Sequence, residues 1–131
     1  MKRTTLFTIT ISLMFFSCTK DELKDEIIGI WRNIERFEGY GNGGDFQWHL
    51  VPEQFQENYQ FDTNRDFFEF NPNGETRCTG TFQILSANEV EINSSCYIGP
   101  ITWDISIDKD IMLVTHHVIE GIIIEKFQRE E

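Results

Sequence analysis

Short runs in which apolar and polar residues alternate dominate the chain from residue 29 onward. These runs are rich in Ile, Val, Phe, Trp and Thr, and turn residues separate them at short intervals. Sustained 3.6-residue periodicity is missing from this part of the sequence, whereas residues 19–28 are compatible with a short helix that ends at Gly29. The pattern therefore predicts an all-β domain behind a short helix.

Eight strands are predicted, and short connections join all of them except the first two. Consecutive hairpins of this kind form a meander, and closing a meander into a ring removes its exposed edges. The predicted fold is a single all-β domain, an eight-stranded antiparallel up-and-down β-barrel. The predicted strands span residues 29–38, 57–61, 66–71, 75–85, 89–96, 100–107, 111–118 and 122–129.

Turn residues set the register of the strands. In residues 71–74, Asn-Pro-Asn-Gly, proline suits the first central position of a type I turn and glycine the left-handed position after it. Pairing Asn71 with Glu75 then places Phe68 opposite Cys78.

The next turn, residues 86–88, predicts a register that brings two cysteines together. With Leu85 opposite Glu89, every apolar residue of this hairpin meets an apolar partner, and a slip by one residue would set Phe and Ile against glutamates. Opposed cysteines on neighbouring strands lie within bridging distance, which predicts a disulfide; two buried thiols that never oxidise are the alternative. The predicted pairs are Ile84 with Val90, Phe82 with Ile92, Gly80 with Ser94 and Cys78 with Cys96.

The last hairpin brings a histidine and a glutamate into the predicted lumen. A two-residue turn at 120–121 sets His116 opposite Glu125, and the neighbouring pair of Val114 with Phe127 points inward. His116 and Glu125 are therefore predicted either to hold the polar group of a ligand or to form a salt link at the open end of the barrel.

The N-terminus has the layout of a secretory signal. Lys2 and Arg3 precede an uncharged apolar stretch that is too short for a comfortable membrane span. Residues 1–17 are predicted to be removed; a buried N-terminal helix is the alternative.

Cys18 lies at the seam between this apolar stretch and a charged segment. Ser17 and Cys18 resemble the lipobox of bacterial lipoproteins, which implies that the Cys18 thiol receives a diacylglycerol and becomes the first residue of the mature chain. Residues 19–22, Thr-Lys-Asp-Glu, resemble the signal of surface-displayed lipoproteins in some Gram-negative bacteria; a solvated linker is the alternative. The expected location is the bacterial cell envelope, on the outer membrane, with periplasmic and surface display both open.

The sequence predicts three segments, and the mature chain is strongly acidic. Residues 1–17 form the signal peptide, residues 18–28 the lipidated cysteine with its charged tether, and residues 29–131 the barrel. Loss of Lys2 and Arg3 with the signal lowers the formal net charge from −11 to −13. Such a surface repels phosphate backbones, so no nucleic-acid partner is expected.

The residues 29–31, Gly-Ile-Trp, open the first strand, and an arginine lies near the end of the last one. Together with eight meandering strands, they resemble the calycin group, which includes lipocalins, fatty-acid-binding proteins and bacterial lipocalin-like lipoproteins. Residues 78–82 and 119–129 are also similar to the bacterial members. The resemblance covers about residues 27–129. It implies a barrel floor of Gly29, Trp31 and Arg129, in which the tryptophan closes the floor and the arginine stacks across it.

The sequence offers little support for catalysis or for a cofactor. His116 and His117 are adjacent on a strand and point to opposite faces, so they cannot readily bind one metal ion, and His49 lies in a long loop. No nucleophile, phosphate loop or metal constellation accompanies them. We therefore expect neither enzyme activity nor a metal or cofactor.

Aromatic residues indicate the function class. An eight-stranded barrel is either filled by its side chains or holds one small ligand. The residues placed inward are Phe37, Phe68, Phe70, Phe82, Trp103 and Phe127. Tyr40, Phe46 and Trp48 lie in the long connection of residues 39–52, which would cover the mouth as a lid or seal the barrel end.

Two functions remain open. The first is binding of a small apolar or amphipathic molecule in the lumen, at Phe68, Phe82, Trp103, His116, Glu125 and Phe127. The alternative is a surface-displayed protein-interaction module with a filled barrel. A lumen cavity below about 300 Å³ would favour the second.

Overall fold

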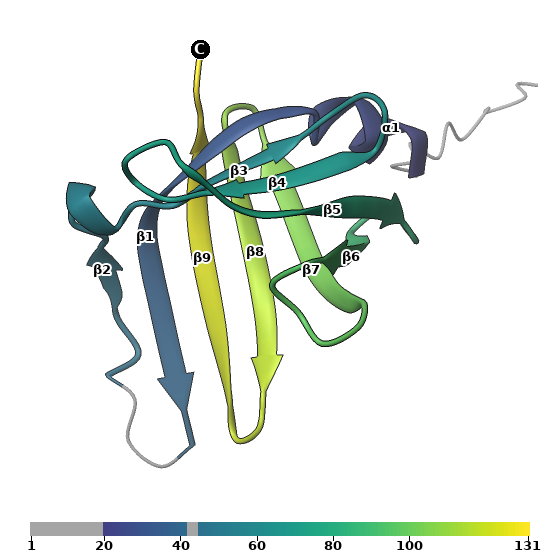
Figure 1. Ribbon diagram of the computed structural model, residues 1–131. Helices are drawn as coiled ribbons and strands as arrows, with labels where there is room; N and C mark the ends of the chain where they lie inside the picture. Colours follow the sequence, from purple (N-terminus) through teal and green to yellow (C-terminus); the bar gives the residue numbers. More distant parts are fainter. Residues whose placement is uncertain (1–19, 42–44) are drawn as a thin grey trace, which may run out of the picture.

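The computed structural model describes residues 20–41 and 45–131 and shows a closed antiparallel β-barrel with up-and-down topology (Figure 1). The predicted fold class is therefore confirmed. The predicted signal peptide, Cys18 and the three residues 42–44 of the long connection lie outside the described residues. Among the residues described, no helix has the length and apolar character needed to cross a membrane.

Eight strands form the barrel, and one extra, short strand pairs with the first of them. The extra strand, β2 (Trp48–Leu50), pairs with β1, and a 3-10 turn, η1 (Glu53–Phe55), follows it. Pairing of β1 with β9 closes the ring. The helix is α1 (Lys20–Glu26), and the barrel strands are β1 (Gly29–Tyr40), β3 (Asn58–Phe61), β4 (Asp66–Phe70), β5 (Thr76–Ile84), β6 (Glu89–Ser94), β7 (Ile101–Asp108), β8 (Ile111–Val118) and β9 (Gly121–Arg129).

Two predicted turns form as expected. The Asn71 amide donates to the Glu75 carbonyl at 2.9 Å, and Gly74 adopts a φ of 84°, the left-handed region that favours glycine. In the next hairpin the Leu85 amide donates to the Glu89 carbonyl at 2.9 Å.

The predicted register of β5 and β6 is also confirmed. Phe82 lies opposite Ile92 and Gly80 opposite Ser94. The Cys78–Cys96 disulfide is present, with a distance of 5.6 Å between the two Cα atoms. Cys96 lies in the turn after β6 rather than in the predicted strand.

The predicted pairing of Phe68 with Cys78 is wrong, because the β4–β5 ladder contains a bulge. Phe70 faces Thr76, but Glu69 and not Phe68 faces Cys78, so β5 has one extra residue. The bulge exchanges the two faces of β4. Phe67 and Glu69 are buried, whereas the rings of Phe68 and Phe70 stack 6.2 Å apart on the outside.

A second bulge, in β1, overturns the inward assignment of Phe37. Asn33 pairs with Phe127, but the next pair is Glu35 with Lys126, which leaves Ile34 without a counterpart in the β1–β9 ladder. Alternation is reversed beyond this point. Phe37 therefore lies on the outer face of the sheet.

The predicted register of the last hairpin is wrong by two residues. The turn is at 119–120, and Val118 pairs with Gly121, so His116 faces Ile123 and not Glu125. Since side chains alternate with a period of two, a shift by two keeps each residue on its predicted face. His116 and Glu125 still point into the barrel.

Helix α1 and the first strand close one end of the barrel. Leu23 and Ile27 of this segment are buried in the hydrophobic core, and the Trp31 indole donates to the Ile27 carbonyl at 2.8 Å. Residues 20–28 thus contribute to the fold itself.

Arg129 joins this closed end to the last strand. Its guanidinium carbon lies 4.1 Å from the centre of the Trp31 ring, and its two terminal nitrogens each donate at 2.7 Å to a carbonyl, those of Ile28 and Glu26. Gly29 has a φ of 139°, and a Cβ there would lie 2.8 Å from the Arg129 Nη1 atom. Gly29, Trp31 and Arg129 therefore lie together at the barrel floor, in the arrangement that the resemblance implies.

We predict that Arg129→Gln lowers the free energy of unfolding by about 1–3 kcal/mol, because two carbonyls lose a charged donor and Trp31 loses its cation. Arg32→Gln is the matched control, since Arg32 makes one exposed ion pair with Glu130 and should cost less than about 1 kcal/mol. Urea unfolding followed by tryptophan fluorescence measures both. Equal losses in the two variants would contradict the role of Arg129.

Candidate binding site at the open end of the barrel

Aromatic side chains fill the barrel from its floor upward. Phe82, Trp103 and Phe127 point inward as predicted, and each is at most 5% exposed. Tyr59 packs against two of them, with ring centres 5.2 Å from Trp103 and 4.7 Å from Phe127. These three residues, predicted to line a ligand cavity, instead pack in one hydrophobic cluster and fill the half of the barrel nearest α1. Phe68, the fourth aromatic residue predicted to line the cavity, lies on the outer face.

A polar cluster lies above this core, around Glu125 of β9. Its carboxylate accepts a hydrogen bond from Asn33 Nδ2 at 3.1 Å and lies 2.9 Å from His116 Nε2. Arg36 Nη1 is 3.9 Å away. The His116 ring meets the Trp103 ring edge-on, with centres 5.5 Å apart. The structure thus brings His116 and Glu125 together at the end of the barrel away from α1, despite the register shift.

His117 confirms the predicted split of the two histidines. Its Nε2 atom lies 2.7 Å from Asp104 Oδ2 on the outer face of the sheet, and its side chain is 71% exposed. One strand therefore presents one histidine–carboxylate pair to the interior and another to solvent.

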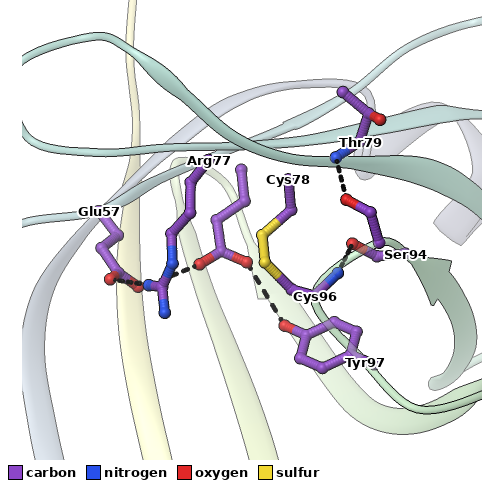
Figure 2. Close-up of a disulfide and its surroundings, with 9 residues drawn as sticks. Glu57, Arg77, Cys78, Thr79, Ser94, Cys96 and Tyr97 are labelled. Atoms are coloured by element: carbon purple, nitrogen blue, oxygen red, sulfur yellow. Dashed lines mark hydrogen bonds and ion pairs between the residues drawn. A yellow bond between two sulfur atoms is a disulfide. The ribbon is translucent and has the colours of Figure 1, made fainter.

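A second polar cluster faces the first across the interior, beside the disulfide. Glu69 is only 3% exposed; its carboxylate lies 3.0 Å from Arg77 Nη1 and accepts a 3.5 Å hydrogen bond from the Tyr97 hydroxyl. Arg77 also binds Glu57, as Figure 2 shows. The Tyr97 ring packs edge-on to Trp103, 6.3 Å between centres, which links this cluster to the aromatic core.

Burial raises the pKa values of three titratable side chains in this interior, Glu69, Tyr97 and Tyr59. Desolvation, and then repulsion from Glu57, raise the pKa of Glu69, while Arg77 and the Tyr97 hydrogen bond oppose the shift. Desolvation likewise raises the pKa of Tyr97 and of Tyr59, and the charge of Glu125 adds to both shifts. Both phenols therefore stay neutral, and the carboxylates of the two clusters act on the same enclosed space.

Two buried polar atoms beside Glu125 and His116 have no hydrogen-bond partner within the protein. They are the donor Trp103 Nε1 and the acceptor Asn33 Oδ1, on side chains that contact His116 and Glu125 respectively. Leaving such a group unsatisfied costs about 1–3 kcal/mol. An acceptor would satisfy Trp103 Nε1 and a donor would satisfy Asn33 Oδ1, and each could come from water or from a polar group of a small molecule.

The lid interpretation of residues 39–52 is wrong for Phe46 and Trp48. The rings of Phe46 and Trp48 lie 6.4 and 5.6 Å from that of Phe37, on the outer face, and Lys126 Nζ is 4.7 Å above the Trp48 ring. Phe46, Trp48 and Leu50 are 60%, 41% and 78% exposed. We call these three residues the outer apolar patch.

A small pocket lies at the closed end, against α1. It measures about 90 Å³, well below the roughly 300 Å³ usual for ligand pockets. Its lining includes Lys24, Ile28, Asp62, Arg65, Phe82 and Ile84. The closed end therefore offers no cavity of the size usual for a small-molecule ligand.

Comparisons with known proteins give no family for this chain. No family model matches it, and no curated protein is significantly similar. The functional reading therefore depends on the residues themselves.

Sequence reasoning missed Asn33, Arg36, Glu69, Arg77 and Tyr97. Glu69 lies within the run Phe-Phe-Glu-Phe, and a charge inside an apolar strand is a usable signal of a functional or paired carboxylate. Simple alternation places Glu69 and Arg36 on the outer face. Both point inward only because of the bulges in the β4–β5 and β1–β9 ladders, which the sequence does not reveal.

We predict that Glu69 makes the protein less stable as pH rises. A carboxyl whose folded pKa is raised binds its proton more tightly in the folded state, so the free energy of unfolding falls from pH 4.5, the unperturbed value, up through the raised pKa. Glu69→Gln should remove this part of the pH dependence, whereas Glu57→Gln should only reduce it, because desolvation, the larger cause of the raised pKa of Glu69, remains. Chemical unfolding at a series of pH values measures the slopes. Identical slopes in wild type and Glu69→Gln would contradict the prediction.

Proposed function

We propose that this protein is a lipid-anchored, lipocalin-like binding protein that takes a small amphipathic molecule at the open end of its barrel. The observation that carries the proposal is the unpaired donor and acceptor, Trp103 Nε1 and Asn33 Oδ1, beside the His116–Glu125 pair. A ligand with a polar head would satisfy both atoms and contact the two charged side chains.

The distribution of side chains supports this end of the barrel. The floor is occupied by Trp31 and Arg129, and the lower lumen by packed aromatic rings. The polar head would lie among Asn33, His116 and Glu125, and the apolar part would pack on the rings of the upper core. A closed eight-stranded barrel compatible with a lipocalin-like domain supplies the rigid frame that such a site needs.

The proposed membrane attachment rests on the sequence around Cys18. The helix that follows begins at Lys20, and its Leu23 is already part of the core. A lipidated Cys18 would hold the barrel within a few residues of the bilayer surface in the bacterial cell envelope.

The second candidate is a surface-displayed interaction module, and the outer apolar patch favours it. Three exposed large apolar side chains lie on β2 and the residues just before it, and β2 is the edge strand of the sheet. Exposed apolar patches and free strand edges are common features of protein contact sites. The filled lower barrel, with a cavity of only about 90 Å³ beside it, also favours this alternative by the size criterion of about 300 Å³.

We predict saturable binding of an environment-sensitive apolar fluorophore to the mature protein, weakened about tenfold by Glu125→Gln or Trp103→Phe. Glu125→Gln removes the charge and keeps the shape of the side chain, whereas Trp103→Phe removes the indole N–H together with one ring of a buried side chain. About 1.4 kcal/mol corresponds to a tenfold change in affinity. His117→Ala is the matched control, because this histidine pairs with a carboxylate on the outer face. Absence of saturable binding in the wild-type protein would contradict the proposal and favour the interaction module.

We predict that Cys18→Ser moves the protein from the membrane fraction to the soluble fraction when the full chain is expressed in a Gram-negative host, since the thiol that would receive the lipid is gone. Incorporation of a labelled fatty acid into the wild-type chain, and its loss in the variant, measures the modification. Equal labelling of both chains would contradict lipidation at Cys18.

A further inference from the structure

We propose that reduction of the Cys78–Cys96 disulfide creates a binding site for a soft divalent metal ion, formed by the two thiolates and the Glu69 carboxylate. The two sulfur atoms and a Glu69 carboxylate oxygen already lie within 4.8 Å of one another. Two thiolates and a carboxylate are a donor set suited to Zn²⁺ or Cd²⁺, with a fourth position left for solvent. The inference does not depend on the ligand site at the open end.

Backbone pairing holds the two cysteines together without the sulfur–sulfur bond. Gly80 pairs with Ser94 two residues from each cysteine, and beyond this pair the Ser95 amide donates to the Thr79 carbonyl at 2.9 Å. Side-chain bonds continue the contact, from the Thr79 amide to Ser95 Oγ at 3.2 Å and from the Cys96 amide to Ser94 Oγ at 3.3 Å (Figure 2). The thiols of the reduced protein would therefore stay close to each other.

The third donor is equally fixed. Glu69 lies opposite Cys78 in the β4–β5 ladder, as a result of the bulge, and Arg77 and Tyr97 hold its carboxylate from two sides. A divalent ion with two thiolates and one carboxylate carries a net charge of −1, which the neighbouring Arg77 would offset. The oxidised protein lacks the thiolates, so the site would exist only after reduction.

The chemistry balances with a dithiol as reductant. The dithiol gives two electrons and two protons to the Cys78–Cys96 bond and itself becomes a disulfide, leaving two thiols on the protein. Binding of the metal ion then releases the two thiol protons to solvent, while the Glu69 carboxylate completes the protein ligands.

Cadmium titration of the Cys18→Ser protein tests the proposal, because this background has no third thiol. Protein reduced with a phosphine and freed of it should bind one Cd²⁺ per chain, seen as thiolate-to-metal absorption in the ultraviolet and as two protons released. Protein left oxidised should show neither signal. Circular dichroism of the reduced protein should retain the β spectrum, and loss of the barrel on reduction would overturn the proposal.

Variants separate this site from an ordinary pair of thiols. Glu69→Gln should weaken Cd²⁺ binding by about tenfold or more while leaving thiolate absorption at saturation, and Cys78→Ser with Cys96→Ser should abolish binding. Glu57→Gln is the matched control, because Glu57 shares Arg77 but is not part of the donor set, and it should bind as the parent does. Equal affinity in the Glu69→Gln and Glu57→Gln variants would overturn the site.

Discussion

Closure between the first and last barrel strands is the constraint on which the rest of this structure depends. β1 pairs with β9 along almost its whole length, and the contact of Trp31 with Arg129 joins the same two strands at the floor. Because the ring is closed, every strand has one face that must fill a shared interior. That interior is aromatic near α1 and polar at the other end, so closure both builds the core and confines the charged side chains to one opening.

The sequence predicted the strands and most of the topology, because turn residues and alternation are local signals. The registers around residues 71–74 and 86–88 follow from Gly74 and from the matching of Phe82 with Ile92, and the disulfide follows from the second of them. Bulges have no comparable signal. Those in β1 and β5 reversed the faces of Phe37 and Phe68. The last turn lies at 119–120 and not at 120–121, with Glu120 at a φ of 70° and Gly121 already paired in β9.

The candidate site shows the same division between local and nonlocal information. The sequence could predict that His116 and Glu125 lie close together on the inner face. The register error of the last hairpin was two residues, and a shift by two does not change which face a side chain points to. The positions of Asn33 and Glu69 could not be predicted, because they depend on pairings with distant strands. The sequence also cannot show that Trp103 Nε1 and Asn33 Oδ1 have no hydrogen-bond partner, because this depends on which side chains surround them in the folded barrel. What the chain binds is therefore decided by contacts between segments far apart in sequence.

The bulge at Ile34 decides which side chains of β1 can reach the same carboxylate. Asn33 and Arg36 are three residues apart, a spacing that strict alternation would put on opposite faces, yet both lie beside Glu125. Deleting Ile34 would leave Glu35 opposite Lys126 and would keep both side chains inward, because Ile34 is the unpaired residue of the ladder. The extra residue thus changes the phase of the amino-acid pattern in β1 without changing how that strand docks on β9.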